Sequence, residues 1–266
     1  MDRSLWAVLT GTFTLRFSTG LTGAMLNFYL ASLVLAGQPG IDGKTVGILS
    51  AAFFLAELVL SPLFGILADR VGHHRVMLYG PAFGAVAVVM TALTTNVVVL
   101  GGTRLLEGAS TAASVPSILG YIALATARNE ALRGRAAARF EGATLAGLGA
   151  GFIVAPKLFE ALGPNAFLLN AVFYGGSFLI YRFGVAEPPG EREALASRHT
   201  GVGRYLALVG HSHVLLLAPT WNPQGLALLG NSLLHYVMPA AFVLDWLLFA
   251  PKGRLNWGDP AKWLIF

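Results

Sequence analysis

The sequence contains no cysteine and few charged residues. The lack of cysteine excludes disulfides, thiolate metal sites, cysteine nucleophiles, and prenyl or palmitoyl anchors. Charged residues make up 12% of the 266-residue chain, against about 25% in soluble domains. Hydrophobic residues make up 55%, and the mean hydropathy is +0.67. This composition predicts an integral membrane protein.

Six apolar runs each reach the roughly 20 residues that a membrane-spanning helix needs. They are Leu5–Ala36, Thr45–Ala68, Val76–Thr95, Val97–Ala127, Phe140–Leu162 and Ala166–Val185. The first run is too long for a cleavable signal peptide and lacks a cleavage pattern. We therefore predict an all-α membrane protein in three parts: a six-helix bundle at residues 1–185, a polar cytoplasmic linker at 186–204, and a C-terminal transmembrane helical hairpin at 205–266.

The positive charges are unevenly distributed between the two sides of the predicted membrane spans. With the N-terminus inside, the outer ends carry only Lys44 and Lys157. The inner segments then carry Arg3, Arg70, Arg75, Arg128, Arg133, Arg135, Arg139, Arg182, Arg192, Arg198 and Arg204. Cytoplasmic loops are enriched in Lys and Arg, so we expect a cytoplasmic N-terminus, eight crossings and a bacterial inner-membrane location. The net charge of +5 then reports orientation and not nucleic-acid binding.

The segment between the second and third apolar runs carries a spaced motif, G-x-x-x-D-R-x-G-x-x-R. Its residues are Gly65, Asp69, Arg70, Gly72 and Arg75. This motif resembles the loop between the second and third helices of major facilitator superfamily transporters, where it is the most specific short signature. His74 departs from the family, which usually has Lys or Arg there. A generic charged loop between two spanning helices is the alternative interpretation.

This resemblance covers residues 1–221 and implies the fold of one transporter half. It also implies secondary active transport of a small solute by alternating access, without catalysis or a cofactor. The motif loop would act as a conformational gate. The implied partners are the solute, protons and membrane lipid, with a homo-oligomer left open.

Four charged residues lie inside the apolar runs: Arg16, Glu57, Arg104 and Glu107. A bare charge in lipid costs at least about 2.5–3.5 kcal/mol, so each should face the bundle interior and have a partner. Arg16 and Glu57 reach similar depths, and we expect them to pair across a polar cavity. The segment Arg104-x-x-Glu-Gly108 resembles the family's fourth-helix signature R-x-x-Q-G, whose arginine is linked to proton coupling. A purely structural Arg104–Glu107 ion pair is the alternative.

Glycines and a short repeat add predictions about packing. Gly147-x-x-x-Gly151 would allow close approach to a neighbouring helix. The longer glycine–proline pattern of the family's antiporters is absent here, so this motif does not support antiport. An arginine four residues before a glycine occurs in the first run and again in the fourth, which suggests two three-helix repeats of opposite topology. Chance similarity is the alternative.

The last fifty residues look different from a transporter. Residues 217–266 resemble a bacterial family of polytopic membrane proteins of unassigned role, so we expect a chimera joined between Ala218 and Gly225. Transport would then be incomplete in this chain, and a monomer would move no solute. A non-transporting remnant is one alternative. An intramembrane enzyme using Asn231, His235 and Asp245 is another.

Overall fold

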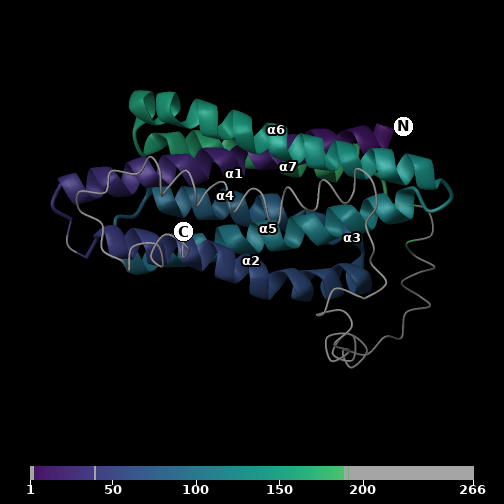
Figure 1. Cartoon of the computed structure of the whole chain (residues 1–266), viewed down its shortest axis with the longest axis horizontal. Coiled ribbons are helices and arrows are strands. Elements are labelled where there is room, and N and C mark those ends of the chain that lie inside the picture. The colour runs from purple at the N-terminus through teal and green to yellow at the C-terminus, as the bar shows by residue number, and fades with distance from the viewer. Residues whose placement is uncertain (1–2, 39, 189–190, 192–266) are drawn as a thin grey trace, which may run out of the picture. The chain divides into compact units, whose positions relative to one another are not determined.

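The computed structural model describes residues 3–38, 40–188 and 191. Within these residues the chain is helical throughout its regular structure (Figure 1), and six helical segments are long and apolar enough to cross a membrane. The helices are α1 (Arg3–Leu35), α2 (Gly43–Val71), α3 (His73–Met77), α4 (Tyr79–Ala92), α5 (Val97–Ala125), α6 (Glu130–Leu162) and α7 (Asn165–Gly184). The predicted C-terminal hairpin, the join, and the three residues of the proposed enzyme site lie outside the described residues.

The sequence located all six spans, but it misplaced the start of one and missed a break in another. The fifth span, α6, begins at Glu130 and not at Phe140. Its first turns are polar, so hydrophobicity misses them, while the Asn129 side chain accepts a hydrogen bond from Leu132 N–H at 2.9 Å and caps the start. The third span is broken at Leu78 into α3 and α4. Pro81 explains this break, because its ring has no N–H and crowds the carbonyl four residues earlier.

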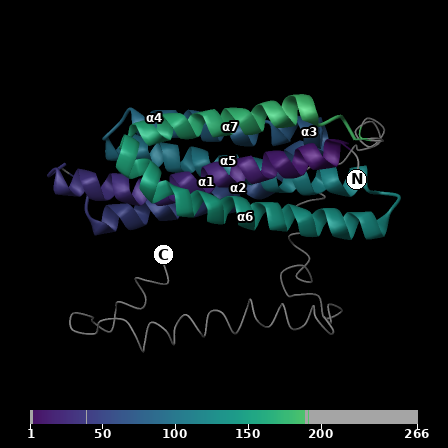
Figure 2. The same ribbon diagram turned by 90° about the horizontal axis from the view of Figure 1, so that it is seen from above.

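The helices pack in a pattern that repeats within the bundle. α1 lies chiefly against α6 and α7, while α5 lies chiefly against α2 and α4. α4 and α7 also lie side by side, as Figure 2 shows. The helices of the first repeat, α1, α2 and α3–α4, correspond in order to α5, α6 and α7 of the second. Under this correspondence, the contacts of α1 with α6 and α7 match the contacts of α5 with α2 and α4. This is the arrangement expected of two related three-helix repeats.

Matching glycines bring helix backbones into contact in the two repeats. A Cβ atom added at Gly20 on α1 would collide with the Leu148 carbonyl oxygen of α6. A Cβ atom added at Gly108 on α5 would collide with the Phe53 carbonyl oxygen of α2. Each glycine follows an arginine by four positions, as the sequence repeat predicted. Glycine is needed at both positions because the two backbones touch there.

Polar contacts hold the opposite face of α1 against α7. The Asn170 side chain donates to the Ser18 carbonyl oxygen at 3.0 Å and to Thr22 Oγ1 at 2.8 Å. The Ser177 hydroxyl donates to the Gly11 carbonyl oxygen at 2.9 Å. Such bonds join helices where no water competes for the polar groups. They fix the rotation of α1 about its axis.

Candidate functional site

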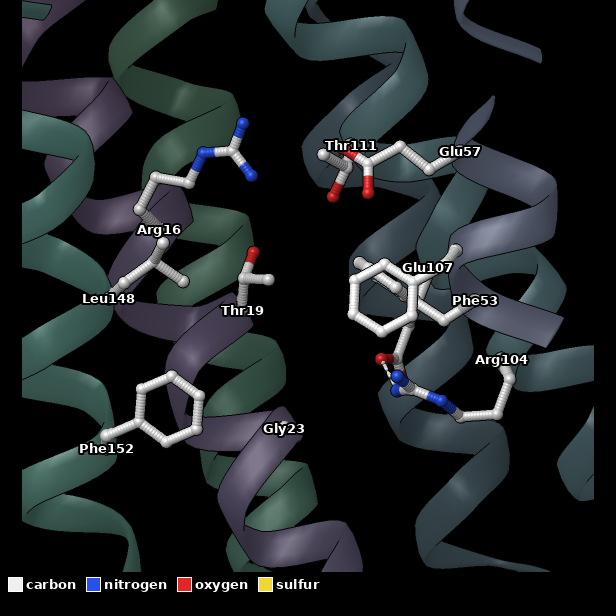
Figure 3. Close-up of a pocket in the computed structure, with 11 residues that line it drawn as sticks. Arg16, Thr19, Gly23, Phe53, Glu57, Arg104, Glu107, Thr111, Leu148 and Phe152 are labelled. Atoms are coloured by element: carbon white, nitrogen blue, oxygen red, sulfur yellow. Dashed lines mark hydrogen bonds and ion pairs between the residues drawn. The ribbon is translucent and has the colours of Figure 1, made fainter. Parts of the chain in front are cut away.

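A cavity of about 340 Å³ lies inside the bundle, between α1, α2, α5 and α6. All four charged residues that the sequence placed in apolar runs line it (Figure 3). The other lining residues are two threonines, three phenylalanines, a leucine and a glycine: Thr19, Thr111, Phe53, Phe54, Phe152, Leu148 and Gly23. The cavity therefore combines charged groups, hydroxyls and aromatic rings within helices that otherwise bury apolar side chains.

Arg16 stands on the wall formed by α1 and α6. Its side chain is only 8% exposed, and Figure 3 shows the guanidinium turned into the cavity. Behind it, a Cβ atom added at Gly147 would lie 2.9 Å from Arg16 Cβ, and one added at Gly151 would lie 2.8 Å from Leu21 N. The two glycines that the sequence singled out therefore face α1 and bring α6 against it. Among the described residues, no hydrogen bond or ion pair to the Arg16 side chain occurs.

Arg104 and Glu107 form a buried ion pair one turn apart on α5. The Arg104 guanidinium also lies over the Phe53 ring of α2, 4.8 Å from its centroid. Within the described residues, Arg104 Nε and Glu107 Oε1 have no hydrogen-bond partner, and both atoms are shielded from solvent. We call Arg104 and Glu107 the closed pair, because their charges compensate each other inside the protein and these two polar atoms are shielded from solvent.

Glu57 of α2 faces Arg16 from the opposite wall, close to Thr111 (Figure 3). Glu57 is partly buried. The Ser61 hydroxyl donates to the backbone carbonyl oxygen of Glu57 at 2.6 Å and not to its carboxylate. Both residues face the predicted cavity, but in the described structure no ion pair within 4.0 Å joins them. The direct contact expected from their depth is therefore not made. The reason is the packing, because α1 lies on α6 while α2 lies on α5, and the cavity separates the two walls.

The motif loop sits where α2 ends and α3 begins. Gly72 has a φ of 105°, which a side chain would strain, and it allows the sharp turn between the helices. Arg70 and Arg75 are exposed, while Gly65 is partly buried. A Cβ atom added at Gly65 would lie 3.8 Å from Pro116 Cβ, which is ordinary van der Waals contact. His74, the departure from the family, places Nε2 3.0 Å from the Tyr181 carbonyl oxygen of α7.

Sequence analysis missed a contact at this loop, between His73 of α3 and Glu191 of the linker. The Glu191 carboxylate accepts from His73 N–H at 2.5 Å and lies 3.2 Å from its Nδ1. On its other side, His73 Nε2 lies 3.6 Å from Asp69. His73 is buried, and its ring links the motif loop to the start of the linker. The available signal was two glutamates shortly after the two prolines of the linker, Glu191 and Glu193, and no spacing marks Glu191 as the contact.

In the part of the chain that the structure describes, no three metal-binding side chains gather at one place. The cavity charges suit a solute or a proton and not a bound metal, because two of the four are arginines, which do not bind metal cations.

The chain resembles bacterial drug-resistance proteins in sequence. The quinolone resistance protein NorA of Staphylococcus aureus is 30% identical over 123 residues, which are 46% of this chain and 30% of NorA. Multidrug resistance protein 2 of Bacillus subtilis is 31% identical over 116 residues, 44% of this chain and 28% of that protein. The matched part of this chain thus spans under a third of each relative.

Solved structures and a family model place the fold. The human organic anion transporter MFSD10 aligns with 70% of this chain and 47% of its own, with a TM-score of 0.58 and 18% identity. A mutant of the peptide transporter POT in complex with sulfate covers 99% of this chain and 56% of its own, with a TM-score of 0.59 and 18% identity. The model of the Major Facilitator Superfamily matches residues 12–261, a range that runs through the predicted join. The chain therefore belongs to the major facilitator superfamily of membrane transport proteins.

Proposed function

We propose that the protein takes part in secondary active transport of a small solute by alternating access, and that the solute binds in the cavity lined by Arg16 and Glu57. The observation that carries the proposal is four charged side chains lining one cavity inside a membrane-spanning bundle. Each such charge is costly in the membrane, and a functional role is the usual reason for keeping it. The cavity volume of about 340 Å³ also lies within the range of small-molecule sites.

The position of the cavity supports the alternating-access part of the proposal. Helices from both repeats contribute walls, and in transporters of this type the solute lies at a repeat interface near the middle of the membrane. Alternating access needs a second bundle that rocks against the first. A second copy of this chain is one source of that bundle. The exposed motif arginines, Arg70 on α2 and Arg75 on α3, would belong to the gate that the two bundles share.

The charged groups give the proposal a route for coupling to protons. Glu57 and Glu107 can each accept a proton, and the two arginines compete with that proton for the carboxylates. Glu57 is the more open of the two, since both Glu107 oxygens are shielded or paired. The name of the quinolone resistance protein NorA makes a quinolone the first substrate to test.

Reconstitution in liposomes tests the proposal. The purified full chain, with its oligomeric state measured by cross-linking, should show saturable solute flux driven by an imposed proton gradient. Glu57→Gln should abolish the gradient dependence because the variant side chain cannot bind the coupled proton. Glu160→Gln is the matched control, since Glu160 is 75% exposed near the C-terminal end of α6 and does not line the cavity. A folded wild-type chain with no flux for any solute, as monomer or oligomer, would favour the non-transporting alternative.

A further inference from the structure

We propose that the solute is amphoteric: its anionic group binds Arg16, its cationic group binds Glu57, and an apolar or aromatic body joins the two. The inference rests on the proposed function, because it names the class of molecule that the same cavity takes. It goes further by assigning each end of the solute to one wall.

The two arginines of the cavity differ in what they can still bind. Arg104 is occupied, with Glu107 as its ion-pair partner and the Phe53 ring beneath its guanidinium. Arg16 has no such partner among the described residues, although its side chain is 92% buried. A buried guanidinium with its fork directed into a cavity is a site for a carboxylate or similar anion. The anionic end of the solute therefore belongs at Arg16.

Glu57 supplies the complementary charge. Figure 3 shows its carboxylate directed toward Arg16 across the cavity, from the opposite wall. Glu107 cannot take its place, because one oxygen pairs with Arg104 and the other has no solvent-accessible surface. A protonated amine is thus drawn to Glu57.

An amphoteric solute can pair both cavity charges, whereas a singly charged solute leaves one of them unpaired. An anion alone would neutralise Arg16 and leave the Glu57 charge facing it unpaired. A cation alone would do the reverse, and a buried charge without a partner is costly. Between the two charges, Phe54, Phe152 and Leu148 provide apolar surface, while Thr19 and Thr111 add hydroxyls. The solute body is therefore apolar, with its charges at opposite ends.

Four probes of similar shape test the proposal by isothermal titration calorimetry on the full chain in detergent micelles. They are 4-(aminomethyl)benzoate with both charges, 4-methylbenzoate with the negative charge, 4-methylbenzylamine with the positive charge, and neutral 4-methylbenzyl alcohol. We expect the amphoteric probe to bind at least about tenfold more tightly than any other, as expected for a second charge-assisted contact. All four probes are compared on the wild-type chain, so misfolding of a variant cannot affect the difference in affinity.

Variants assign the two ends of the probe. Arg16→Gln should lower the affinity for the amphoteric probe to that of the amine, and Glu57→Gln should lower it to that of the benzoate. Glu160→Gln should change neither, and helical content by circular dichroism checks that each variant is folded. The reversed pair Arg16→Glu with Glu57→Arg should keep the preference for the amphoteric probe.

The outcomes separate this inference from the proposed function. Equal affinity for the amphoteric and a singly charged or neutral probe overturns the inference, as does no binding of the amphoteric probe in the millimolar range. Gradient-driven flux of another solute would then still support transport. Selective binding of the amphoteric probe without any flux would support the inference and count against transport by this chain.

Discussion

Arg16 on α1 and Arg104 on α5 hold matching places in the two three-helix repeats. Each precedes by four positions a glycine that touches the backbone of the neighbouring helix. The repeats also end their second helices alike, at Gly72 and Gly163, both with positive φ. The two arginines nevertheless differ, because Arg104 has a carboxylate one turn away and Arg16 has none.

The two arginines share the packing of their helices but differ in the charges around them. Backbone contact at the matching glycines is a property of the helix packing, so it recurs in both repeats. The charge environment depends on single side chains, so it differs between them. One arginine is compensated inside the protein, while the other lines the cavity opposite Glu57 and has no ion-pair partner among the described residues.

The largest expected effect comes from breaking the closed pair. Glu107→Gln leaves the Arg104 charge buried without its partner, so the free energy of unfolding should fall by about 3–5 kcal/mol. Glu57→Gln removes a carboxylate that has no direct ion pair, so the loss should be about 0–1 kcal/mol. Titration of helicity with denaturing detergent measures both variants.

The double variant Arg104→Gln with Glu107→Gln controls this experiment. It removes both charges and should recover a large part of the stability lost in Glu107→Gln. The difference between the repeats would disappear if Glu57→Gln proved as damaging as Glu107→Gln, or if the double variant recovered nothing.

The shared packing can be broken next. A methyl group added by Gly20→Ala or Gly108→Ala would collide with backbone, and each change should cost about 1–3 kcal/mol. Gly102→Ala and Gly142→Ala lie on the same two pairs of helices with nothing within 4 Å of the added methyl. These controls should leave the unfolding free energy unchanged or raise it by up to about 1 kcal/mol. A large cost in only one repeat would contradict the common packing.

A smaller, local effect is expected at the motif loop, whose spaced motif has no counterpart in the second repeat. Glu191→Ala removes the acceptor of His73 N–H, so the protection of that amide from hydrogen exchange should fall by about 1 kcal/mol. Exchange measured by mass spectrometry over the end of α2 and α3 reports this change. Unaltered exchange at His73 would mean that the linker does not hold the motif loop.

The smallest effect concerns the start of α2. The Thr45 hydroxyl and N–H donate to the Asp42 carboxylate at 2.7 and 2.8 Å, and these bonds lower the pKa of Asp42 from 3.8. The cap should therefore be fully effective above pH 3.8 and weaken as the pH falls through the lower folded-state value. Hydrogen exchange at Thr45 should show this pH dependence in the wild type and lose it in Asp42→Ala. Identical profiles would rule out a carboxylate cap.

The sequence predicted the fold well because long apolar runs, glycines and prolines act locally. It also predicted that the four charged residues face the bundle interior, since each must avoid lipid, and the structure adds that all four line one cavity. It could not predict that Arg16 and Glu57 stay apart, because helix pairing, and not depth along the helix, sets the distance between walls. The contact between His73 and Glu191 joins residues far apart in the chain and has no local signal.

The most direct test asks whether the cavity is open to water, and the cysteine-free chain suits it. Single cysteines at Thr19 and Thr111 would lie in the cavity, while one at Leu58, which is 74% exposed on α2, would lie on the outer surface of the bundle within the membrane. We expect a charged, water-soluble thiol reagent to label the two cavity positions and spare Leu58→Cys, with the amphoteric probe slowing the labelling. Cavity cysteines that stay unlabelled, or that label no faster than Leu58→Cys, would contradict the account.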